Sequence, residues 1–306
     1  MATKNTIGSV QQNVAESHFP ERIIDLIKSR SSIMPRGQVK VADYIIKNRS
    51  TFWLLSVQEV AKAVGVSHAT VIRFCRALGY DGFSDFSRDV INIMKLEITV
   101  ADRFSNSSLA IDETEAKNAS LFKQVLSSEV DSLNALANSV SESDIKTCVD
   151  LMLQADAIYI LGRMSSFPIA LHFESTLSKV CNTCFLIPES ELQAAAILKK
   201  MTKNSVLFSI AYTRYSTSTI SFTEMAHEKG CRIVAITNSL LSPIVQHAAL
   251  KFITGVKPLS FADLFVAPFA LVTALSLEYS LPTKHQTADS LEEFDKIMLR
   301  RKSVVV

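Results

Sequence analysis

The sequence predicts an all-α N-terminal domain joined to an α/β domain whose five-stranded parallel sheet is covered by helices on both faces. Helical patterns of apolar residues fill the first third of the chain, whereas short apolar runs alternate with helical segments beyond residue 143. With 306 residues, 48% of them hydrophobic, the chain is long enough for two such cores. We place the first domain at residues 18–98, a linker at 99–115, the second domain at 116–282 and a C-terminal tail at 283–306.

Four helices are predicted in the N-terminal domain. Residues 20–30 and 36–49 carry isoleucine and valine side chains at helical spacing, and residues 56–64 and 67–78 continue this pattern. Gly65 lies between the last two segments. After about residue 98, Ser, Asn, Asp and Glu become frequent, which is typical of a linker.

Five apolar runs are expected to form buried strands, at residues 157–161, 184–187, 206–211, 232–237 and 250–254. The segments between them have helical patterns, at 166–180, 191–200, 217–229 and 242–249. Longer helices are expected at 116–137 and 260–280, and the polar tail is expected to contain one more. Because strands that alternate with helices form a parallel sheet, we expect a ligand pocket at the carboxyl ends of the strands.

The scarcity of glycine argues against two common kinds of nucleotide-binding site. Eight glycines occur in the chain, well below the usual fraction of about 7%. None forms a G-x-G or opens a G-x-x-x-x-G-K, so the sequence lacks the phosphate loops of Rossmann and P-loop proteins. We therefore expect no cofactor, and no pattern of ligands indicates a metal site.

The cysteines and the hydropathy pattern indicate the compartment. Five scattered cysteines, an odd number, are typical of a reduced, cytoplasmic protein. Cys181 and Cys184 form a C-x-x-C without a second pair, and we interpret them as structural. The longest uncharged apolar run, residues 264–277, contains Pro268 and is too short to cross a bilayer. The polar N-terminus lacks the apolar core of a signal peptide, so we expect a soluble protein with no membrane contact.

The net charge of +2 conceals an asymmetry along the chain. Residues 26–80 hold nine basic and two acidic side chains, a charge of +7 that leaves −5 on the rest of the protein. A basic block beside an acidic remainder is expected when one domain binds nucleic acid and the other does not. A solvated charged surface would give the same count, so charge alone leaves both interpretations open.

The third and fourth predicted helices have the spacing of a helix-turn-helix. Ser56 and Glu59 form a capping box that starts the first helix of this motif. Ala61 is small where the helices cross, Gly65 lies at the turn where a positive φ is needed, and Ser67 caps the second helix. The apolar residues expected to face inward are Val60, Val64, Val71 and Phe74.

In a helix-turn-helix, the start of the second helix enters the major groove of DNA. The side chains expected to face the groove or the adjacent backbone are Ser67, His68, Thr70, Arg73 and Arg76. Lys40 and Lys47 are expected to position phosphates, together with Arg36. Arg73 could read a guanine or hold a phosphate, and His68 could instead be a solvated residue at a helix start.

The stretch SVQEVAKAVGVSHATVIRFCRALGYDGFSDF, residues 56–86, resembles the winged-helix-like N-terminal domain of RpiR/MurR-type bacterial transcription regulators. The residues that fit the family's characteristic phrase are Ser67, Ala69, Thr70, Arg73, Phe74, Leu78, Gly79, Gly82, Phe83 and Phe86. The resemblance covers roughly residues 20–280. It implies that a sugar isomerase (SIS) domain follows the DNA-binding domain, in agreement with the α/β pattern.

The resemblance implies a phosphate-binding loop after the first strand, which in SIS domains has the form G-x-G-x-S. This chain has G-R-M-S-S, in which Gly162 and Ser166 match while Met164 occupies the second glycine. We therefore expect the loop to depart from the parent geometry. Arg163 and Ser165 offer further donors, and the helix that starts at Ser166 favours an anion. Ser166 could alternatively be only a helix cap.

The second SIS phrase, S-x-S-G-x-T-x-x-T, follows the third strand. Thr213, Ser216 and Thr219 keep its hydroxyl groups, whereas Ala211 loses one and Arg214 replaces the glycine. A cluster of hydroxyls with a guanidinium at a helix start suits a phosphate or carboxylate. The residues expected to bind the effector are Gly162, Arg163, Ser165, Ser166, Thr213, Arg214, Ser216 and Thr219.

Three functions are compatible with this sequence. The first is a transcription regulator that binds a double-stranded DNA operator and whose SIS domain senses a phosphorylated sugar or sugar acid. The second keeps DNA binding but makes the SIS domain a ligand-free dimerisation scaffold. The third is a sugar-phosphate isomerase, which needs a general base, and His172 and Glu174 are the candidates near the first loop.

We favour the first function and expect no catalytic residue, because the spacing of His172 and Glu174 fits surface or interface roles at least as well. One helix-turn-helix reads too few base pairs for useful specificity, so such proteins pair on palindromic sites. We expect a homodimer or a dimer of dimers, held by the SIS domain and the helix at 116–137.

Overall fold

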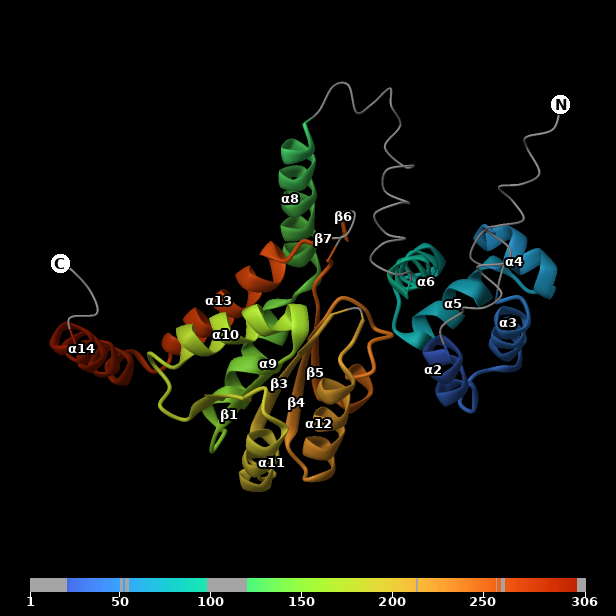
Figure 1. The fold of residues 1–306 in the computed structure, drawn as a ribbon. Helices are drawn as coiled ribbons and strands as arrows, with labels where there is room; N and C mark the ends of the chain where they lie inside the picture. Colours follow the sequence, from blue (N-terminus) through green and yellow to red (C-terminus); the bar gives the residue numbers. More distant parts are fainter. Residues whose placement is uncertain are drawn as a thin grey trace. The chain divides into compact units, whose positions relative to one another are not determined.

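A computed structural model describes residues 21–49, 52, 55–97, 120–212, 214–256, 258–259 and 262–301. The chain divides into two units, Met1–Ser105 and Asn106–Val306, which we call the helical unit and the sheet unit (Figure 1). The predicted linker at 99–115 lies outside the described residues, as does Thr213.

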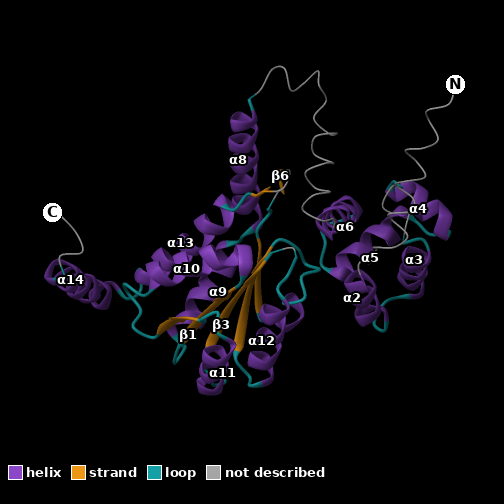
Figure 2. Cartoon of the chain, in the orientation of Figure 1, coloured by secondary structure: helices purple, strands orange, loops and turns teal. Residues whose placement is uncertain are grey.

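In the described part of the helical unit, every regular element is a helix (Figure 2). These helices are α2 (Glu21–Ser31), α3 (Arg36–Lys47), α4 (Val57–Val64), α5 (His68–Leu78) and α6 (Phe83–Glu97). The first four match the predicted helices, whereas α6 was not predicted. Phe86 of α6 closes the core, because its ring lies 5.9 Å from that of Phe52, 6.2 Å from Phe74 and 5.1 Å from Tyr80.

The sheet unit contains the predicted five-stranded parallel sheet. Its strands are β1 (Ile158–Gly162), β2 (Cys184–Leu186), β3 (Val206–Ala211), β4 (Arg232–Thr237) and β5 (Leu250–Ile253). Their order is β2-β1-β3-β4-β5. Gly162 pairs with Ile210, and Ala211 pairs with Thr237, so β1, β3 and β4 end beside one another.

Helices cover both faces of this sheet. On one face lie α9 (Glu142–Leu153), α10 (Phe167–Leu177) and α13 (Val266–Ser280), and on the other lie α11 (Glu191–Lys200) and α12 (Thr217–Glu228). The unit also contains α8 (Leu121–Ser139) and α14 (Lys284–Arg300), and no residue of α14 is buried. Alternate residues of β1 face opposite sides. Ile158 and Ile160 pack in the core beneath α9, α10 and α13, whereas Tyr159 and Leu161 pack in the core beneath α11 and α12.

Two predicted helices are wrong in extent. Residues 242–249 form only the 3-10 turn η3 (Val245–His247), because the segment is short, contains Pro243 and becomes extended again at Ala248. The helix expected at 260–280 begins at Val266, since β6 (Pro258–Leu259) and β7 (Ala262–Asp263) pair as a small antiparallel ladder before it. The helix α9 was not predicted.

The C-x-x-C lies inside the sheet unit as two free thiols. Cys181 and Cys184 are each 5% exposed and belong to the core beneath α10 and α13, which fits the structural interpretation. Burial raises the pKa of Cys148 to about 12, so that thiol stays protonated near neutral pH. Among the described helices, none has the length and apolar character needed to cross a membrane.

Candidate DNA-binding and effector sites

Local hydrogen bonds begin and end the two helices α4 and α5. The Ser56 N–H donates to Glu59 Oε2 at 2.7 Å and thereby lowers the pKa of Glu59, whose own N–H donates to Ser56 Oγ at 3.3 Å. These bonds form the predicted capping box. Gly65 ends α4 with a φ of 71°, the left-handed conformation predicted from the sequence. Ser67 then caps α5 by accepting from the Thr70 N–H at 3.3 Å.

Most residues predicted to contact DNA face the solvent. The exposed ones are Ser67, His68, Arg73 and Arg76 of the α5 region and Lys40 and Lys47 of α3. The guanidinium of Arg76 already makes one hydrogen bond within the protein, because its Nε donates to the Asp81 carbonyl oxygen at 3.2 Å. The accessibility of His68 and Arg73 is what contact with a base or a phosphate requires.

Thr70 is only half exposed, because it packs on α3. Its hydroxyl lies 2.9 Å from Ser67 Oγ, and a Cβ added to Gly37 would lie 3.1 Å from its methyl carbon. Gly37 therefore lets α3 approach the start of α5 closely, a role that we did not predict. A signal was available, because glycine inside a helix is unfavourable unless a close approach requires it.

The candidate effector site lies where the strand order reverses. With the order β2-β1-β3-β4-β5, the reversal falls between β1 and β3, which is where α/β sheets bind ligands. The loop after β1 contains residues 163–166, and the loop after β3 contains residues 212–216. The Tyr212 N–H donates to Ser166 Oγ at 3.3 Å, so the two loops predicted to bind an anion meet.

Gly162 allows close packing at the end of β1, and Ser166 connects the loops after β1 and β3. A Cβ at Gly162 would lie 2.6 Å from the Ser166 carbonyl oxygen and 2.9 Å from Ala170 Cβ, so only glycine fits there. Ser166 precedes α10, but its side chain makes no cap hydrogen bond to that helix. The alternative in which Ser166 is only a helix cap therefore fails, because its hydroxyl instead joins the β3 loop.

Arg163 is committed to the protein rather than open to an effector. Its side chain is 7% exposed and donates to the Ile187 carbonyl at 2.9 Å and the Pro188 carbonyl at 2.6 Å. Burial lowers the pKa of its guanidinium. Nε is buried without a hydrogen-bond partner. Arg163 therefore connects the loop after β1 to the segment after β2. This corrects the prediction that its side chain binds the effector.

Two non-glycine residues hold the left-handed conformation in these loops. Met164 has a φ of 52° and Arg214 a φ of 67°, and among the described residues no other non-glycine residue has a positive φ. Both occupy positions where the SIS phrases have glycine. Each loop therefore keeps a backbone that favours glycine, at the energetic cost of a side chain in that conformation. Met164 is 64% exposed, so its side chain does not fill the core.

The other predicted effector residues differ in accessibility. Ser165 and Arg214 are exposed, and Ser216 is half-buried at the start of α12, where its hydroxyl makes no cap hydrogen bond. Thr219 is 1% exposed within the first turn of α12, so it supports the helix and cannot reach a ligand directly in this conformation. The structure therefore brings Ser165, Arg214 and Ser216 to the strand ends as accessible polar groups.

The end of β4 and the segment that follows it contain buried hydroxyls without a hydrogen-bond partner. Thr237 pairs with Ala211 in the sheet, and its buried hydroxyl has no hydrogen-bond partner. Ser242 is 3% exposed, and its hydroxyl also lacks a partner. Buried hydroxyls are normally satisfied in folded proteins, so these two are available to a ligand or to water.

Both candidate bases for an isomerase lie on α10. His172 Nε2 lies 2.9 Å from Thr273 Oγ1, and its ring packs 5.2 Å from that of Phe269, so it faces α13. Glu174 is half-buried on α10, and burial raises its pKa. No cluster of three metal-binding side chains occurs in the part of the chain that the structure describes.

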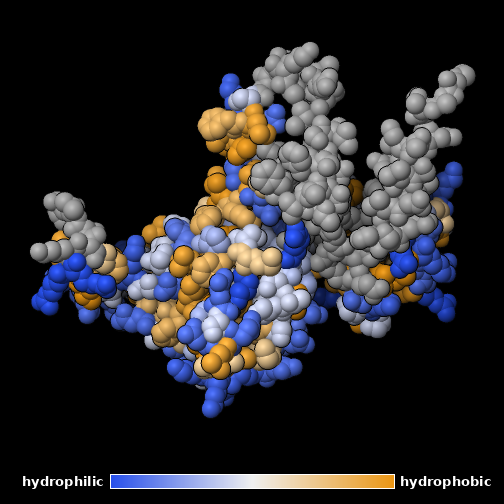
Figure 3. All heavy atoms as spheres, viewed as in Figure 1, coloured by the Kyte–Doolittle hydropathy of each residue, from blue (hydrophilic) through white to orange (hydrophobic). Residues whose placement is uncertain are grey.

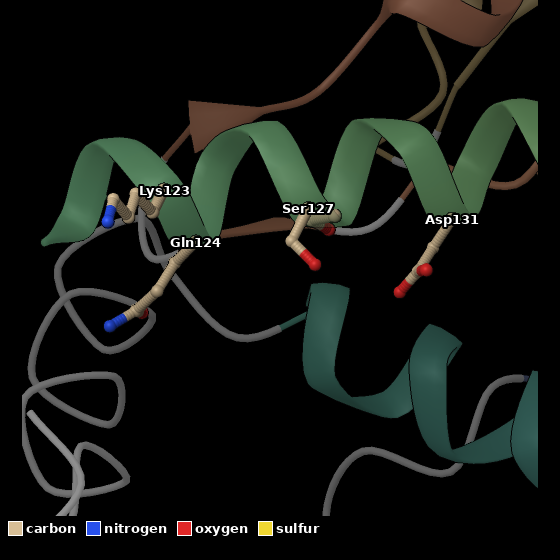
Figure 4. Close-up of a pocket in the computed structure, with 5 residues that line it drawn as sticks. Lys123, Gln124, Ser127 and Asp131 are labelled. Atoms are coloured by element: carbon tan, nitrogen blue, oxygen red, sulfur yellow. The ribbon is translucent and has the colours of Figure 1, made fainter. Parts of the chain in front are cut away.

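A further polar surface lies on α8. Gln124, Ser127 and Asp131 project from one side of this helix, and Lys123 lies beside them (Figure 4). All of these side chains come from a single helix, and none belongs to the loops after β1 and β3. This surface therefore lacks the converging groups of an effector site.

Comparison with known families matches both halves of this arrangement. Residues 21–95 match the helix-turn-helix domain of the rpiR family, and residues 151–277 match the SIS domain. An uncharacterized HTH-type transcriptional regulator of Haemophilus influenzae is 25% identical over 291 residues, covering 89% of this chain and 96% of the relative. The HTH-type transcriptional regulator HexR of Pseudomonas aeruginosa is 23% identical over 230 residues, covering 75% and 78%.

Two solved structures share the fold. The NanR protein of Vibrio vulnificus complexed with ManNAc-6P has a TM-score of 0.54 at 20% identity, covering 90% of this chain and 98% of its own. The sugar isomerase domain of an RpiR transcription factor from Sphaerobacter thermophilus has a TM-score of 0.55 at 20% identity, covering 57% and 98%.

Proposed function

Because the chain joins an RpiR-family helix-turn-helix domain to a SIS domain, we propose that this transcription regulator senses a phosphorylated sugar or sugar acid. The observation that carries the sensing role is the hydrogen bond from the Tyr212 N–H to Ser166 Oγ. It supports one anion site made by both loops where the strand order reverses. The NanR structure, solved with ManNAc-6P, supports a phosphorylated sugar as the ligand class.

The phosphate is proposed to bind Arg214, Ser216 and Ser165. These side chains supply one guanidinium and two hydroxyls that are not buried. A guanidinium forms strong charge-assisted bonds to phosphate, and the free N–H groups at the start of α12 add an environment that favours anions. The unsatisfied hydroxyls of Thr237 and Ser242 are suited to the sugar portion or to water that bridges it.

DNA is proposed to bind along α5, as the exposure of His68 and Arg73 supports. In this role Lys40 and Lys47 of α3 hold phosphates, because α3 packs against the start of α5 through Gly37. Such contacts displace counterions, so binding is expected to fall steeply as salt rises. A regulator of this kind acts on operator DNA in the cytoplasm.

A homodimer through α8 is proposed to pair the DNA-binding units. The exposed apolar residues of α8 are Leu121, Phe122, Leu126 and Val130, between 49% and 69% exposed (Figure 3). The last three recur at intervals of four and form one apolar stripe, which a second copy can cover. Pairing two helix-turn-helix motifs provides the palindromic reading that one motif lacks.

A ligand-free scaffold is the second candidate, and the commitment of Arg163 favours it. Thermal melting with hexose 6-phosphates and N-acetylhexosamine 6-phosphates, combined with an assay for their isomerisation, separates the candidates. We expect a higher melting temperature and no turnover. No shift with any compound would support the scaffold, and turnover would support an isomerase.

Matched variants locate the binding event. Ser216→Ala is expected to reduce the melting shift, whereas Ser221→Ala, an exposed serine further along α12, should leave it unchanged. Equal shifts in the parent and both variants would mean that the sugar phosphate binds elsewhere.

A further inference from the structure

The C-terminal helix α14 has an apolar face that its own chain leaves open. It spans Lys284–Arg300, and none of its residues is buried. Leu291, Phe294 and Ile297 are 39%, 37% and 49% exposed, and they recur at three-residue intervals along one side (Figure 3). Most helical stability in proteins comes from packing such a face, so a helix of this kind is expected to have a partner.

The charges on α14 are separated along its length. Lys284 begins the helix, the acidic residues Asp289, Glu292, Glu293 and Asp295 follow it, and the basic residues after them are Lys296, Arg300 and Arg301. The helix dipole accounts for basic residues in the last turn, but the first turn contains no acidic residue. The acidic block lies further along the helix, where Glu292 forms an ion pair with Lys296 of the same helix. The dipole does not explain the other acidic residues.

We propose that α14 pairs in antiparallel orientation with α14 of a second copy of this chain. Asp289 and Arg300 are eleven residues apart, about three helical turns, so they lie on the same side of the apolar face. An antiparallel pair centred near Phe294 brings Asp289 opposite the partner's Arg300 and covers both apolar faces. A parallel pair in register would instead place acidic residues beside acidic residues, which is unfavourable.

One contact of α14 with its own body falls on this face, at Phe294, and Leu291 and Ile297 on either side of it remain exposed. Lys179 Nζ lies 5.9 Å from the centre of the Phe294 ring, a cation–π contact from the turn that follows α10. The pairing surface is distinct from the apolar stripe of α8, and α14 lies beyond residue 277, where the SIS match ends. The α14 pair is therefore a second self-association surface.

Charge exchange tests the antiparallel pairing in the full-length protein. Analytical ultracentrifugation over a range of concentrations measures the dissociation constant of each variant. Asp289→Arg and Arg300→Asp alone each place like charges opposite each other, and we expect about fivefold weaker association. The double variant carrying both changes restores opposite charges and should return to within about twofold of the parent.

An apolar substitution tests the same surface without changing charge. Phe294→Ser should weaken association about tenfold, since it removes a central aromatic contact. Circular dichroism and melting temperature verify that each variant remains folded. Unchanged association in Phe294→Ser and both single charge variants would overturn the proposal, as would single variants that weaken association without recovery in the double variant. The effector-induced melting shift is measured on the same proteins, so failure here leaves the proposed sensing function standing.

Discussion

The two units assemble their functional residues in different ways. In the helical unit, the bonds that cap α4 and α5 join residues three apart, and those that close the turn after α4 join residues three to five apart. In the sheet unit, the candidate effector site depends on a bond between Ser166 and Tyr212, which are 46 residues apart. The helix-turn-helix is therefore encoded by local sequence, whereas the candidate effector site exists only when the parallel sheet has its correct register.

The units also differ in how they use the left-handed backbone. The helix-turn-helix places glycine at its turn, where Gly65 has a φ of 71° and no strain results. The effector loops place Met164 and Arg214 in the same region of conformational space. Strained residues concentrate at functional sites, so this difference agrees with a binding role for the loops.

The largest expected effect is a loss of stability at Gly162, where the sheet unit leaves no space for a side chain. Gly162→Ala would place a Cβ 2.6 Å from the Ser166 carbonyl oxygen and should lower the free energy of unfolding by about 1–3 kcal/mol. Gly255→Ala is the control, because no atom lies within 4 Å of its added Cβ. Denaturant unfolding measures both variants. Equal losses would contradict the tight packing that we infer around Gly162.

A comparable effect on binding is expected in the helical unit. Arg73→Ala should weaken specific DNA binding about tenfold or more and leave the melting temperature unchanged, because Arg73 is exposed. Fluorescence anisotropy with a DNA fragment selected from genomic sequence measures the affinity. Arg30→Ala, an exposed arginine on α2, is the control. If Arg73→Ala bound like the parent, the placement of α5 in the groove would be wrong.

A smaller pair of effects, opposite in sign, tests the contrast in backbone strain. Gly65→Ala forces a side chain into the left-handed region and should destabilise the protein by about 1 kcal/mol. Met164→Gly relieves that conformation and should stabilise it by up to about 1 kcal/mol, less the entropy that glycine adds to the unfolded chain. Calorimetric melting checks both signs. Destabilisation by Met164→Gly would show that the side chain contributes packing.

The smallest expected effect is a loss of folded-state stability at low pH. Burial and the neighbouring His227 lower the pKa of His247, whose ring lies 5.1 Å from that of His227. A histidine with a lowered folded pKa binds fewer protons than in the unfolded state, so stability falls as pH drops below its unfolded pKa. Melting of the sheet unit at pH 5.5 and 7.5 should show this loss, and His247→Asn should reduce it. An identical pH dependence in both proteins would exclude His247 as a source.

Features that depend on nearby residues could be predicted from the sequence, whereas contacts between distant segments could not. The capping box of Ser56 and Glu59, the left-handed Gly65 and the Ser67 cap were all predictable, because each depends on residues a few positions away. The five strands were also predictable, since continuous apolar runs indicate strands buried on both faces. The packing of Gly37 on Thr70 was not predicted, because it joins helices that are distant in sequence.

The candidate effector site was predictable in location but only partly in the side chains that it presents. Residues of both loops were correctly expected at the strand ends, since parallel strands end at one edge of the sheet. The commitment of Arg163 to two carbonyl groups could not be predicted, because it depends on where the chain runs after β2. The burial of Thr219 similarly depends on how α12 lies on the sheet.

The central claim is that the loops after β1 and β3 form one phosphate-binding site. Isothermal titration calorimetry with a hexose 6-phosphate or N-acetylhexosamine 6-phosphate that raises the melting temperature tests it most directly, with the unphosphorylated sugar as the control ligand. We predict binding by the parent, at least about tenfold weaker binding by Arg214→Ala because a charge-assisted contact is lost, and no detectable binding of the unphosphorylated sugar. Equal affinity of the parent and Arg214→Ala, or equal binding of both sugars, would contradict this account of the site.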